Sequence, residues 1–251
     1  MIVIDIGNTD TVIGIYLKKN IKKIFRLNTN QLTSKKNIST FFLLNKIFKI
    51  DKNNKICVIS SVVINREKII SSFIKSKNYE ILNINLKNIP KNIKFKYNSN
   101  QLGADRIANS YAAINKYGKN SLVVDFGTAT TFDVVKNNIY QGGVIAPGIN
   151  ISLKALVNHA SKLNNISIRE VKNIVGKNTK HSMQSGFYWG YVSLVNGIIN
   201  KLVFENKFKP KIILTGGLAN IFKKQINYKS FYEPNLTLEG LYLIGLKKYV
   251  R

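Results

Sequence analysis

Cysteine is almost absent from this sequence, which contains one in 251 residues. A single cysteine forms no disulfide framework within the chain and no cysteine-based metal site. Cys57 lies inside the apolar run 56–59, so we expect a buried thiol in a strand. The two histidines, His159 and His181, have no acid or cysteine at ligand spacing. We therefore expect no histidine-based metal site.

Long hydrophobic runs are also lacking. No stretch approaches the ~18 apolar residues of a membrane span. The apolar residues at the N-terminus follow no basic segment and meet an acid at Asp5, unlike a signal peptide. We expect a cytoplasmic protein with no membrane partner. Hydrophobic residues still make up 45% of the chain, which is enough for the core of one large or two smaller domains.

Acidic residues are scarce, since 12 Asp and Glu stand against 39 Lys and Arg, and the net charge is +27. A charge of this size can attract nucleic acid or anionic membrane. The lysines are spread along the whole chain among many Asn and Ile, as at 18–19 and 35–36, with no basic stripe on one element. A compositional bias explains this pattern, and steering of anionic substrates is the alternative. We expect no specific nucleic-acid partner.

A strand–turn–strand pattern occurs twice in the chain. An apolar run at 1–6 ends in an acid and a glycine turn and is followed by a second strand at 11–17, and residues 121–135 repeat this design. The two copies match at one constant offset in three places: Asp5 and Asp125, Gly7 and Gly127, Thr11 and Thr131.

The chemistry of this pattern indicates phosphate binding. Glycine allows backbone N–H groups to approach an anion closely, and successive N–H groups in a turn form a concave anion site. An aspartate beside phosphate would be repelled, so it would act through a metal ion or water. For one copy, a plain capped hairpin is the simpler explanation. Because two copies match, we predict two phosphate-binding turns in two lobes built alike.

The remaining sequence alternates between strands and helices, which is typical of layered α/β proteins. We place the boundary between the lobes before the second copy, giving an N-terminal lobe at 1–118 and a C-terminal lobe at 119–251. No Ser/Gly linker separates them, so we expect close packing around a cleft. The pattern predicts strands at 56–63, 81–84, 93–97 and 211–214, and helices at 37–48, 66–76, 101–117, 218–225 and 238–247.

Four further segments could carry chemistry, and each has a structural alternative. Residues 103–106 place an acid beside an arginine near a helix start, where the acid could simply cap the helix. Residues 142–148 combine glycines with one of four prolines, as plain turns do. Thr179, after 175–178, could be a helix N-cap. Residues 215–217 lie at a strand-to-helix junction, where a base or ribose could lie flat on the backbone.

Taken in this order, the segments resemble type III pantothenate kinases across almost the full chain. The Gly-Ala-Asp-Arg segment at 103–106 is the most family-specific, whereas an Asp-x-Gly-x-Thr hairpin marks only the superfamily of acetate kinase, sugar kinases, Hsp70 and actin. The resemblance implies two ribonuclease H-like lobes of the actin-like ATPase fold, with a nucleotide cleft between them. The matching segments lie at 5–9, 103–106, 125–131, 142–148, 176–179 and 215–217.

The resemblance also implies an activity: transfer of phosphate from ATP to pantothenate, giving 4′-phosphopantothenate in the first step of coenzyme A biosynthesis. Asp105 would be the catalytic base, Asp125 would coordinate potassium or ammonium, and Mg²⁺ would bridge phosphate oxygens. The implied ATP-binding residues are Asp5, Ile6, Gly7, Asn8, Thr9, Asp10, Thr11, Val12 and Thr128. The implied pantothenate-binding residues are Tyr97, Gly103, Ala104, Asp105, Arg106 and, from the partner subunit of a homodimer, Thr179.

The chain departs from the family pattern in loops. The family usually has Tyr-x-x-Pro before the Gly-Ala-Asp-Arg segment, whereas residues 97–100 read Tyr-Asn-Ser-Asn. Two other expected prolines are replaced, one near Ile64 and one by Asn164. No acid that the chemistry needs is lost. The rival interpretations are another kinase or phosphatase of the superfamily and a nucleotide-binding regulator without catalytic activity.

Overall fold

The computed structural model describes residues 1–51, 55–98, 101–160 and 166–249. They form two compact units: unit 1 contains Met1–Lys116 and Asn235–Arg251, and unit 2 contains Tyr117–Pro234. The sequence-based division assigned all of 119–251 to the second lobe, and the structure differs for the last helix. Two expected proline positions, 100 and 164, lie outside the described residues.

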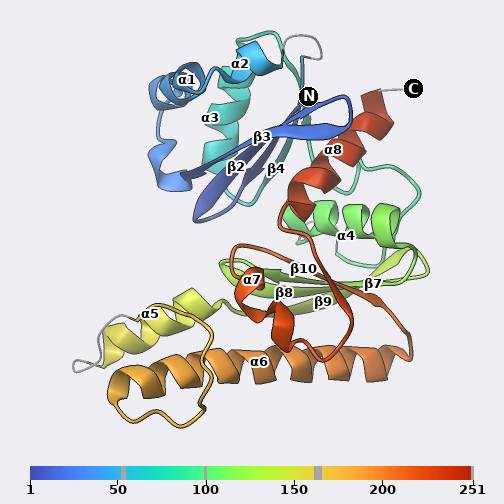
Figure 1. Ribbon diagram of the computed structural model, residues 1–251. Coiled ribbons are helices and arrows are strands. Elements are labelled where there is room, and N and C mark those ends of the chain that lie inside the picture. The colour runs from blue at the N-terminus through green and yellow to red at the C-terminus, as the bar shows by residue number, and fades with distance from the viewer. Residues whose placement is uncertain (52–54, 99–100, 161–165, 250–251) are drawn as a thin grey trace. The chain divides into compact units, whose positions relative to one another are not determined.

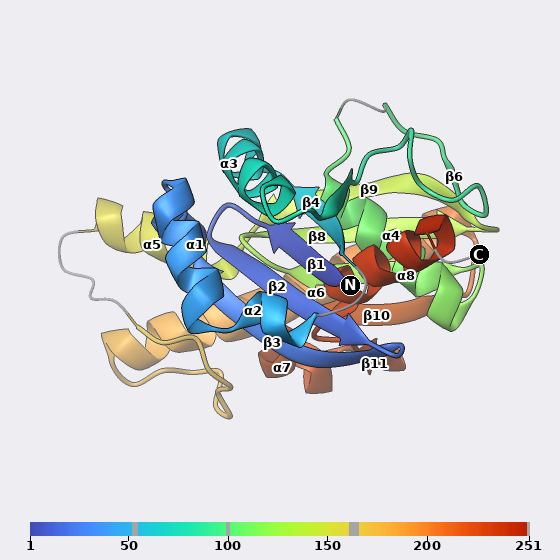
Figure 2. The ribbon, with the colours of Figure 1, turned by 90° about the horizontal axis from the view of Figure 1, so that it is seen from above.

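Unit 1 contains a five-stranded sheet in the order β3-β2-β1-β4-β5. The first three strands are antiparallel, and β4 and β5 continue parallel to β1. The helices α1, α2 and α3 lie together on one side of this sheet and α8 lies on the other (Figures 1 and 2). The elements of unit 1 are β1 (Ile2–Ile6), β2 (Asp10–Leu17), β3 (Asn20–Asn28), α1 (Lys35–Leu44), α2 (Ile47–Ile50), β4 (Ile56–Ser61), α3 (Ile64–Lys75), β5 (Glu80–Asn83), β6 (Lys94–Phe95), α4 (Ala104–Tyr117, whose last residue belongs to unit 2) and α8 (Leu236–Tyr249).

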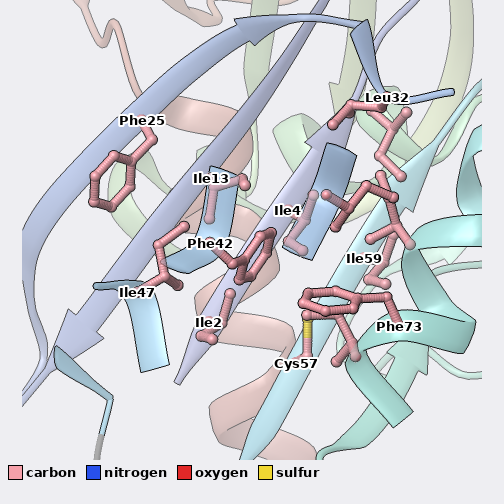
Figure 3. Packing of buried hydrophobic residues seen from close by; sticks show 14 of the residues in the cluster. Ile2, Ile4, Ile13, Phe25, Leu32, Phe42, Ile47, Cys57, Ile59 and Phe73 are labelled. Atoms are coloured by element: carbon pink, nitrogen blue, oxygen red, sulfur yellow. The ribbon is translucent and has the colours of Figure 1, made fainter. Parts of the chain in front are cut away.

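The core of unit 1 follows from alternation along the strands, because successive strand residues face opposite sides of the sheet. Ile2 and Ile4 face the helices α1 and α3, and Cys57 joins them from β4. Phe42 and Phe73 pack over this surface with ring centroids 5.2 Å apart (Figure 3). Cys57 is fully buried, as predicted for a core thiol.

The opposite face of this sheet explains why α8 belongs to unit 1. A Cβ at Gly245 would lie 2.6 Å from a Val58 methyl and 2.9 Å from the Met1 sulfur, so the helix backbone lies directly against β1 and β4. A Cβ at Gly240 would lie 2.0 Å from the Ala108 carbonyl oxygen on α4, so the approach there is closer still. A chain-order division could not foresee this return, because it depends on two glycines that let α8 dock on strands distant in sequence.

Unit 2 repeats the same sheet plan, with its strands in the order β11-β10-β7-β8-β9. Here β7, β8 and β9 are antiparallel, and β10 and β11 run parallel to β7. Side chains of α6 and α7 cover one face of this sheet. The two lobes built alike are therefore confirmed. The elements are β7 (Ser121–Phe126), β8 (Ala129–Lys136), β9 (Ile139–Pro147), α5 (Ile149–His159), α6 (Thr179–Asn206), β10 (Lys211–Thr215), α7 (Ala219–Phe222) and β11 (Ser230–Tyr232).

The strand registers correct one part of the predicted repeat. Ile6 pairs with Thr11 in unit 1, whereas Phe126 pairs with Thr130 in unit 2. Thr130, not Thr131, is thus the counterpart of Thr11, because the second turn is one residue shorter. The β-bulges agree, since they follow residue 15 in β2 and residue 134 in β8. Thr9 consequently corresponds to Thr128.

Several predicted elements differ at their ends. The helix expected at 37–48 is two helices, because Lys46 adopts a left-handed conformation with φ of 52°. The helix expected from 101 begins at Ala104. Among the described residues, no helix combines the length and apolar character that a membrane crossing requires.

Candidate active site

The turn of unit 1 joins β1 to β2 and is closed by backbone and side-chain contacts. The Gly7 N–H donates to the Asp10 carbonyl at 3.0 Å. A Cβ at Gly7 would lie 2.9 Å from that oxygen, so the close turn requires glycine. Asn8 and Thr9, at the tip, are exposed. The tip is therefore available to an anionic ligand.

Thr29, which sequence reasoning missed, holds this turn from behind. Its hydroxyl donates to the Gly7 carbonyl at 2.7 Å and lies 2.9 Å from the Thr11 hydroxyl. Its N–H donates to the Thr9 carbonyl at 2.9 Å. Thr29 is buried just after β3 and lies far from the turn in sequence. No local motif marks it.

Three of the other residues expected at this turn have side chains engaged within unit 1. Ile6 belongs to the apolar core and Thr11 is fully buried. Asp10 forms a 3.1 Å ion pair with Arg26. Ile6 and Thr11 would therefore contact a ligand through the main chain. Val12, the in-register partner of Asp5, is partly buried.

Asp5 lies at the end of β1, in register with Ser60 on the parallel strand β4. In-register neighbours place their side chains on the same face of a sheet. Ser60 is fully buried, and its hydroxyl has no hydrogen-bond partner among the described residues. An orphaned buried hydroxyl costs about 1–3 kcal/mol. The Asp5 carboxylate and this hydroxyl are both oxygen ligands of the kind that Mg²⁺ or its bound water accepts.

The first turn of α4 carries the Gly-Ala-Asp-Arg segment. The Asp105 carboxylate accepts a hydrogen bond from the Arg106 N–H at 2.8 Å. A Cβ at Gly103 would lie 2.4 Å from Asp105 Oδ1, so glycine makes room for the carboxylate. Ala104, between them, is buried. Burial raises the pKa of the Asp105 carboxyl above its ordinary value, and it outweighs the lowering effects of the Arg106 N–H and charge.

Arg106 is buried beside this acid, with 6% of its surface exposed. Its guanidinium lies 5.9 Å from the ring centroid of Tyr97. The structure therefore brings together Tyr97 and the Gly-Ala-Asp-Arg segment, although the proline expected between them is missing. A buried guanidinium is suited to binding a carboxylate or phosphate with two hydrogen bonds.

The turn of unit 2 joins β7 to β8 and exposes Gly127 and Thr128. Gly148, just before α5, packs against its backbone, since a Cβ there would lie 2.0 Å from the Thr128 carbonyl oxygen and 2.9 Å from that of Gly127. The glycine-rich segment at 142–148 thus has a positioning role at its end, beyond turn formation.

Asp125 is the penultimate residue of β7 and lies in register with Thr131 on β8 and Thr215 on β10. Thr215 is buried. Three oxygen-bearing side chains in one row across three strands form a donor set suited to a hard cation, with no nitrogen or sulfur donor among them. This set fits a monovalent cation such as potassium.

Thr179 is the first residue of α6 and is exposed. It is not the N-cap, because the Asn178 side chain accepts the hydrogen bond from the His181 N–H at 2.9 Å. The capping explanation for Thr179 is therefore wrong. Within the described ranges, no group of three or more His, Cys, Asp and Glu side chains is arranged to hold a metal ion.

Comparisons with known proteins agree on one family. The family model described as Type III pantothenate kinase matches residues 1–201. A protein of that name from Pelagibacter ubique (strain HTCC1062) is 40% identical over 245 residues, which cover 96% of each chain. Another of that name, from Desulfosudis oleivorans, is 41% identical over 260 residues, covering 98% of each.

Among solved structures, the ROK hexokinase from Thermus thermophilus matches with a TM-score of 0.52 at 11% sequence identity. The match covers 99% of both chains. At this identity the likeness concerns the fold alone, and it places the chain among the two-lobed α/β folds of the sugar kinases, as the sequence predicted.

Proposed function

The chain belongs to the type III pantothenate kinase family, and we propose that Asp105 is the general base of its reaction. Membership of this family makes the protein an enzyme that transfers phosphate from ATP to pantothenate, giving 4′-phosphopantothenate on the route to coenzyme A. The observation that carries the proposal is the position of the Asp105 carboxylate at the start of α4, where it accepts a hydrogen bond from the Arg106 N–H beside the buried Arg106 side chain.

Proton removal is the chemical task that this carboxylate suits. The primary hydroxyl of pantothenate must lose its proton as its oxygen attacks the γ-phosphorus of ATP. A base whose pKa lies above that of an ordinary carboxylate accepts the proton more readily. The hydrogen bond from the Arg106 N–H fixes the orientation of the Asp105 carboxylate.

We propose that Arg106 and Tyr97 recognise the substrate. The guanidinium would pair with the carboxylate of pantothenate, since the two groups form parallel hydrogen bonds. Tyr97, 37% exposed and 5.9 Å from that guanidinium, would bound the same site. Gly103 and Ala104 would contribute the backbone at the start of α4.

We propose that ATP phosphates bind at the two turns, through Gly7, Asn8 and Thr9 in unit 1 and Thr128 in unit 2. Exposed tips with glycine beside them present backbone N–H groups to an anion. Asp5 and Ser60 would hold Mg²⁺ through its bound water, and the ion would offset phosphate charge when present. Asp10 would support the turn through its ion pair with Arg26.

We propose that Asp125, with Thr131 and Thr215, holds potassium or ammonium, whose charge would favour phosphate binding. Turnover should therefore depend on one of these ions, and Asp125→Ala should remove the dependence together with most of the activity. Equal turnover in potassium and in choline salts would overturn this assignment.

We also propose a homodimer in which Thr179 serves the site of the partner subunit. The outer face of α6 carries small residues at helical spacing, and a Cβ at Gly186, Gly190 or Gly197 would meet nothing within 4 Å. Phe204 on the same helix is 80% exposed. A second copy of the helix could approach this face closely.

The test of the function is coupled ATP turnover with pantothenate, compared with glucose and other sugars as acceptors. We expect turnover when pantothenate is the acceptor and none when a sugar is the acceptor. Turnover with a sugar and not with pantothenate would contradict the proposal. For the dimer, mixing Asp105→Asn with Thr179→Ala should restore activity, because one site of each mixed dimer has both residues intact. No restoration would exclude a contribution in trans.

A further inference from the structure

Gly216 follows β10 directly and leads towards α7. Its φ is +90°, a conformation that other residues rarely adopt. The preceding residue, Thr215, is the in-register neighbour of Asp125. Gly216 therefore leaves the sheet beside Asp125, the penultimate residue of β7.

The space around Gly216 is filled on one side by that aspartate. A Cβ at Gly216 would lie 2.4 Å from Asp125 Oδ1 and 2.6 Å from the backbone N and C atoms of Phe126. These distances are far below van der Waals contact. By contrast, Gly118 has a φ of +95°, and a Cβ there would meet nothing within 4 Å. Glycine is thus required at 118 only by its dihedral angle, but at 216 also by its neighbours.

Phe126 cannot easily give way to an added methyl group. Its backbone pairs with Thr130 in the β7–β8 ladder, and its ring stacks on Phe222 at 5.4 Å. The Leu218 N–H reaches the Phe126 carbonyl at 3.5 Å, which ties the segment after β10 to β7. The Asp125 carboxylate is therefore the part that would move.

We propose that Gly216 is a positioning residue. Its Cα, which carries no side chain, packs against the Asp125 carboxylate and fixes the orientation of that carboxylate for the bound cation. This role differs from a flat surface for the base or ribose of the nucleotide, which the glycine pair at 216–217 suggested by sequence. The inference rests on the proposed function of Asp125 as cation ligand. Metal-ligand distances are set to within about 0.2 Å, so a displaced carboxylate weakens cation binding.

The experiment compares Gly216→Ala with Gly118→Ala, which introduces the same dihedral strain without a clash. Binding is followed by the rise in melting temperature when choline chloride is replaced by potassium chloride at equal ionic strength, without substrates. Turnover is titrated with potassium in parallel. We expect Gly216→Ala to need about tenfold more potassium for the half-maximal rise in melting temperature and for half-maximal turnover, equivalent to about 1.4 kcal/mol. Gly118→Ala should respond to potassium like the wild type.

The outcomes separate this inference from the proposed function. A wild-type protein without any potassium response would overturn the cation site and the inference with it. A normal response of Gly216→Ala, beside a responsive wild type, would overturn the inference alone. A Gly216→Ala variant with unchanged potassium response and a raised KM for ATP would assign Gly216 to the nucleotide and also overturn it.

If Gly216→Ala cannot be purified for binding studies, a second variant tests the inference. Removing the carboxylate removes the shortest contact, so the double variant Gly216→Ala with Asp125→Ala should be recovered in higher yield and melt at a higher temperature than Gly216→Ala. A double variant as poor as the single one would show that the carboxylate is not what the methyl group displaces.

Discussion

The two turns of this protein have the same strand plan and are held in different ways. In unit 1 a side chain holds the turn, because the Thr29 hydroxyl forms hydrogen bonds with the Gly7 carbonyl and the Thr11 hydroxyl. In unit 2 close backbone contact holds the turn, because Gly148 packs against the Thr128 carbonyl. One architecture thus supports its turn through hydrogen bonds in one copy and through the absence of a side chain in the other.

Neither turn carries Asp105, so replacing this proposed base should separate its effect on turnover from any effect on ATP binding. We expect Asp105→Asn to lower turnover by about 10²–10⁴-fold, with ATP affinity nearly unchanged because both turns are intact. Steady-state kinetics measures the turnover, and ATP titration measures the affinity. Near-normal turnover would exclude Asp105 as the base, and loss of ATP binding would indicate that the segment also holds the nucleotide.

The raised pKa of Asp105 adds a prediction about pH. Its folded-state pKa lies above the unfolded value, so burying the ionised form destabilises the fold once the pH rises above the unfolded pKa. Asp105→Asn should therefore be more stable than the wild type at neutral pH, and the difference should vanish below the unfolded pKa, where both side chains are neutral. Denaturant unfolding at neutral and acidic pH measures this. An Asn variant that is less stable at neutral pH would contradict the desolvation argument.

In unit 2 the close packing of the turn is tested by replacing Gly148. The Gly148→Ala methyl group would meet backbone atoms of Thr128, which cannot rotate away, so we expect a loss of about 3 kcal/mol of unfolding free energy and weaker ATP binding. Gly217→Ala is the matched control for stability, because its Cβ would meet nothing within 4 Å. Denaturant unfolding that gave equal losses for both variants would show that Gly148 is not needed for close packing.

In unit 1 the matching change is Thr29→Ala, which removes hydrogen bonds and adds no atoms. We expect a loss of about 2 kcal/mol of unfolding free energy, because the Gly7 carbonyl and Thr11 hydroxyl lose a partner. The KM for ATP should rise. Thr29→Ser keeps the hydroxyl and should recover most of both. If Thr29→Ser behaves like Thr29→Ala, the methyl group rather than the hydroxyl supports the turn.

The smallest effect is expected at Ser60, the neighbour of Asp5. Without ligands, Ser60→Ala should change the unfolding free energy by less than about 1 kcal/mol, since its hydroxyl has no hydrogen-bond partner among the described residues. The stabilisation that ATP with Mg²⁺ gives should be smaller than in the wild type. The control is Ser71→Ala on α3, which also removes a buried hydroxyl without a partner in the described part of the chain, and it should keep the full ligand stabilisation. Equal ligand stabilisation in both variants would remove Ser60 from the site.

Much of the fold could be predicted because the signals are local. Ile2, Val3 and Ile4 form an unbroken apolar run before Asp5, and such a short run predicts a strand that is buried on both faces. Asp5 with Gly7, and Asp125 with Gly127, mark strand ends at tight turns. The acid at 105 indicated a helix start, and α4 begins one residue earlier. The placement of α8 in unit 1 could not be predicted, because chain order carries no information on which sheet a helix returns to.

The sequence by itself determined the two strand–turn–strand copies, the order of the family motifs and the identity of the acids, because each depends on residues close together in the chain. Only the tertiary structure decided which distant residues lie against the turns and beside those acids. Ser60 lies on β4, Thr29 and Gly216 follow β3 and β10, and the counterpart of Thr11 is set by strand register. Register and close approach are properties of pairs of segments, and the cost of a misplaced methyl group or hydroxyl appears only when the segments meet.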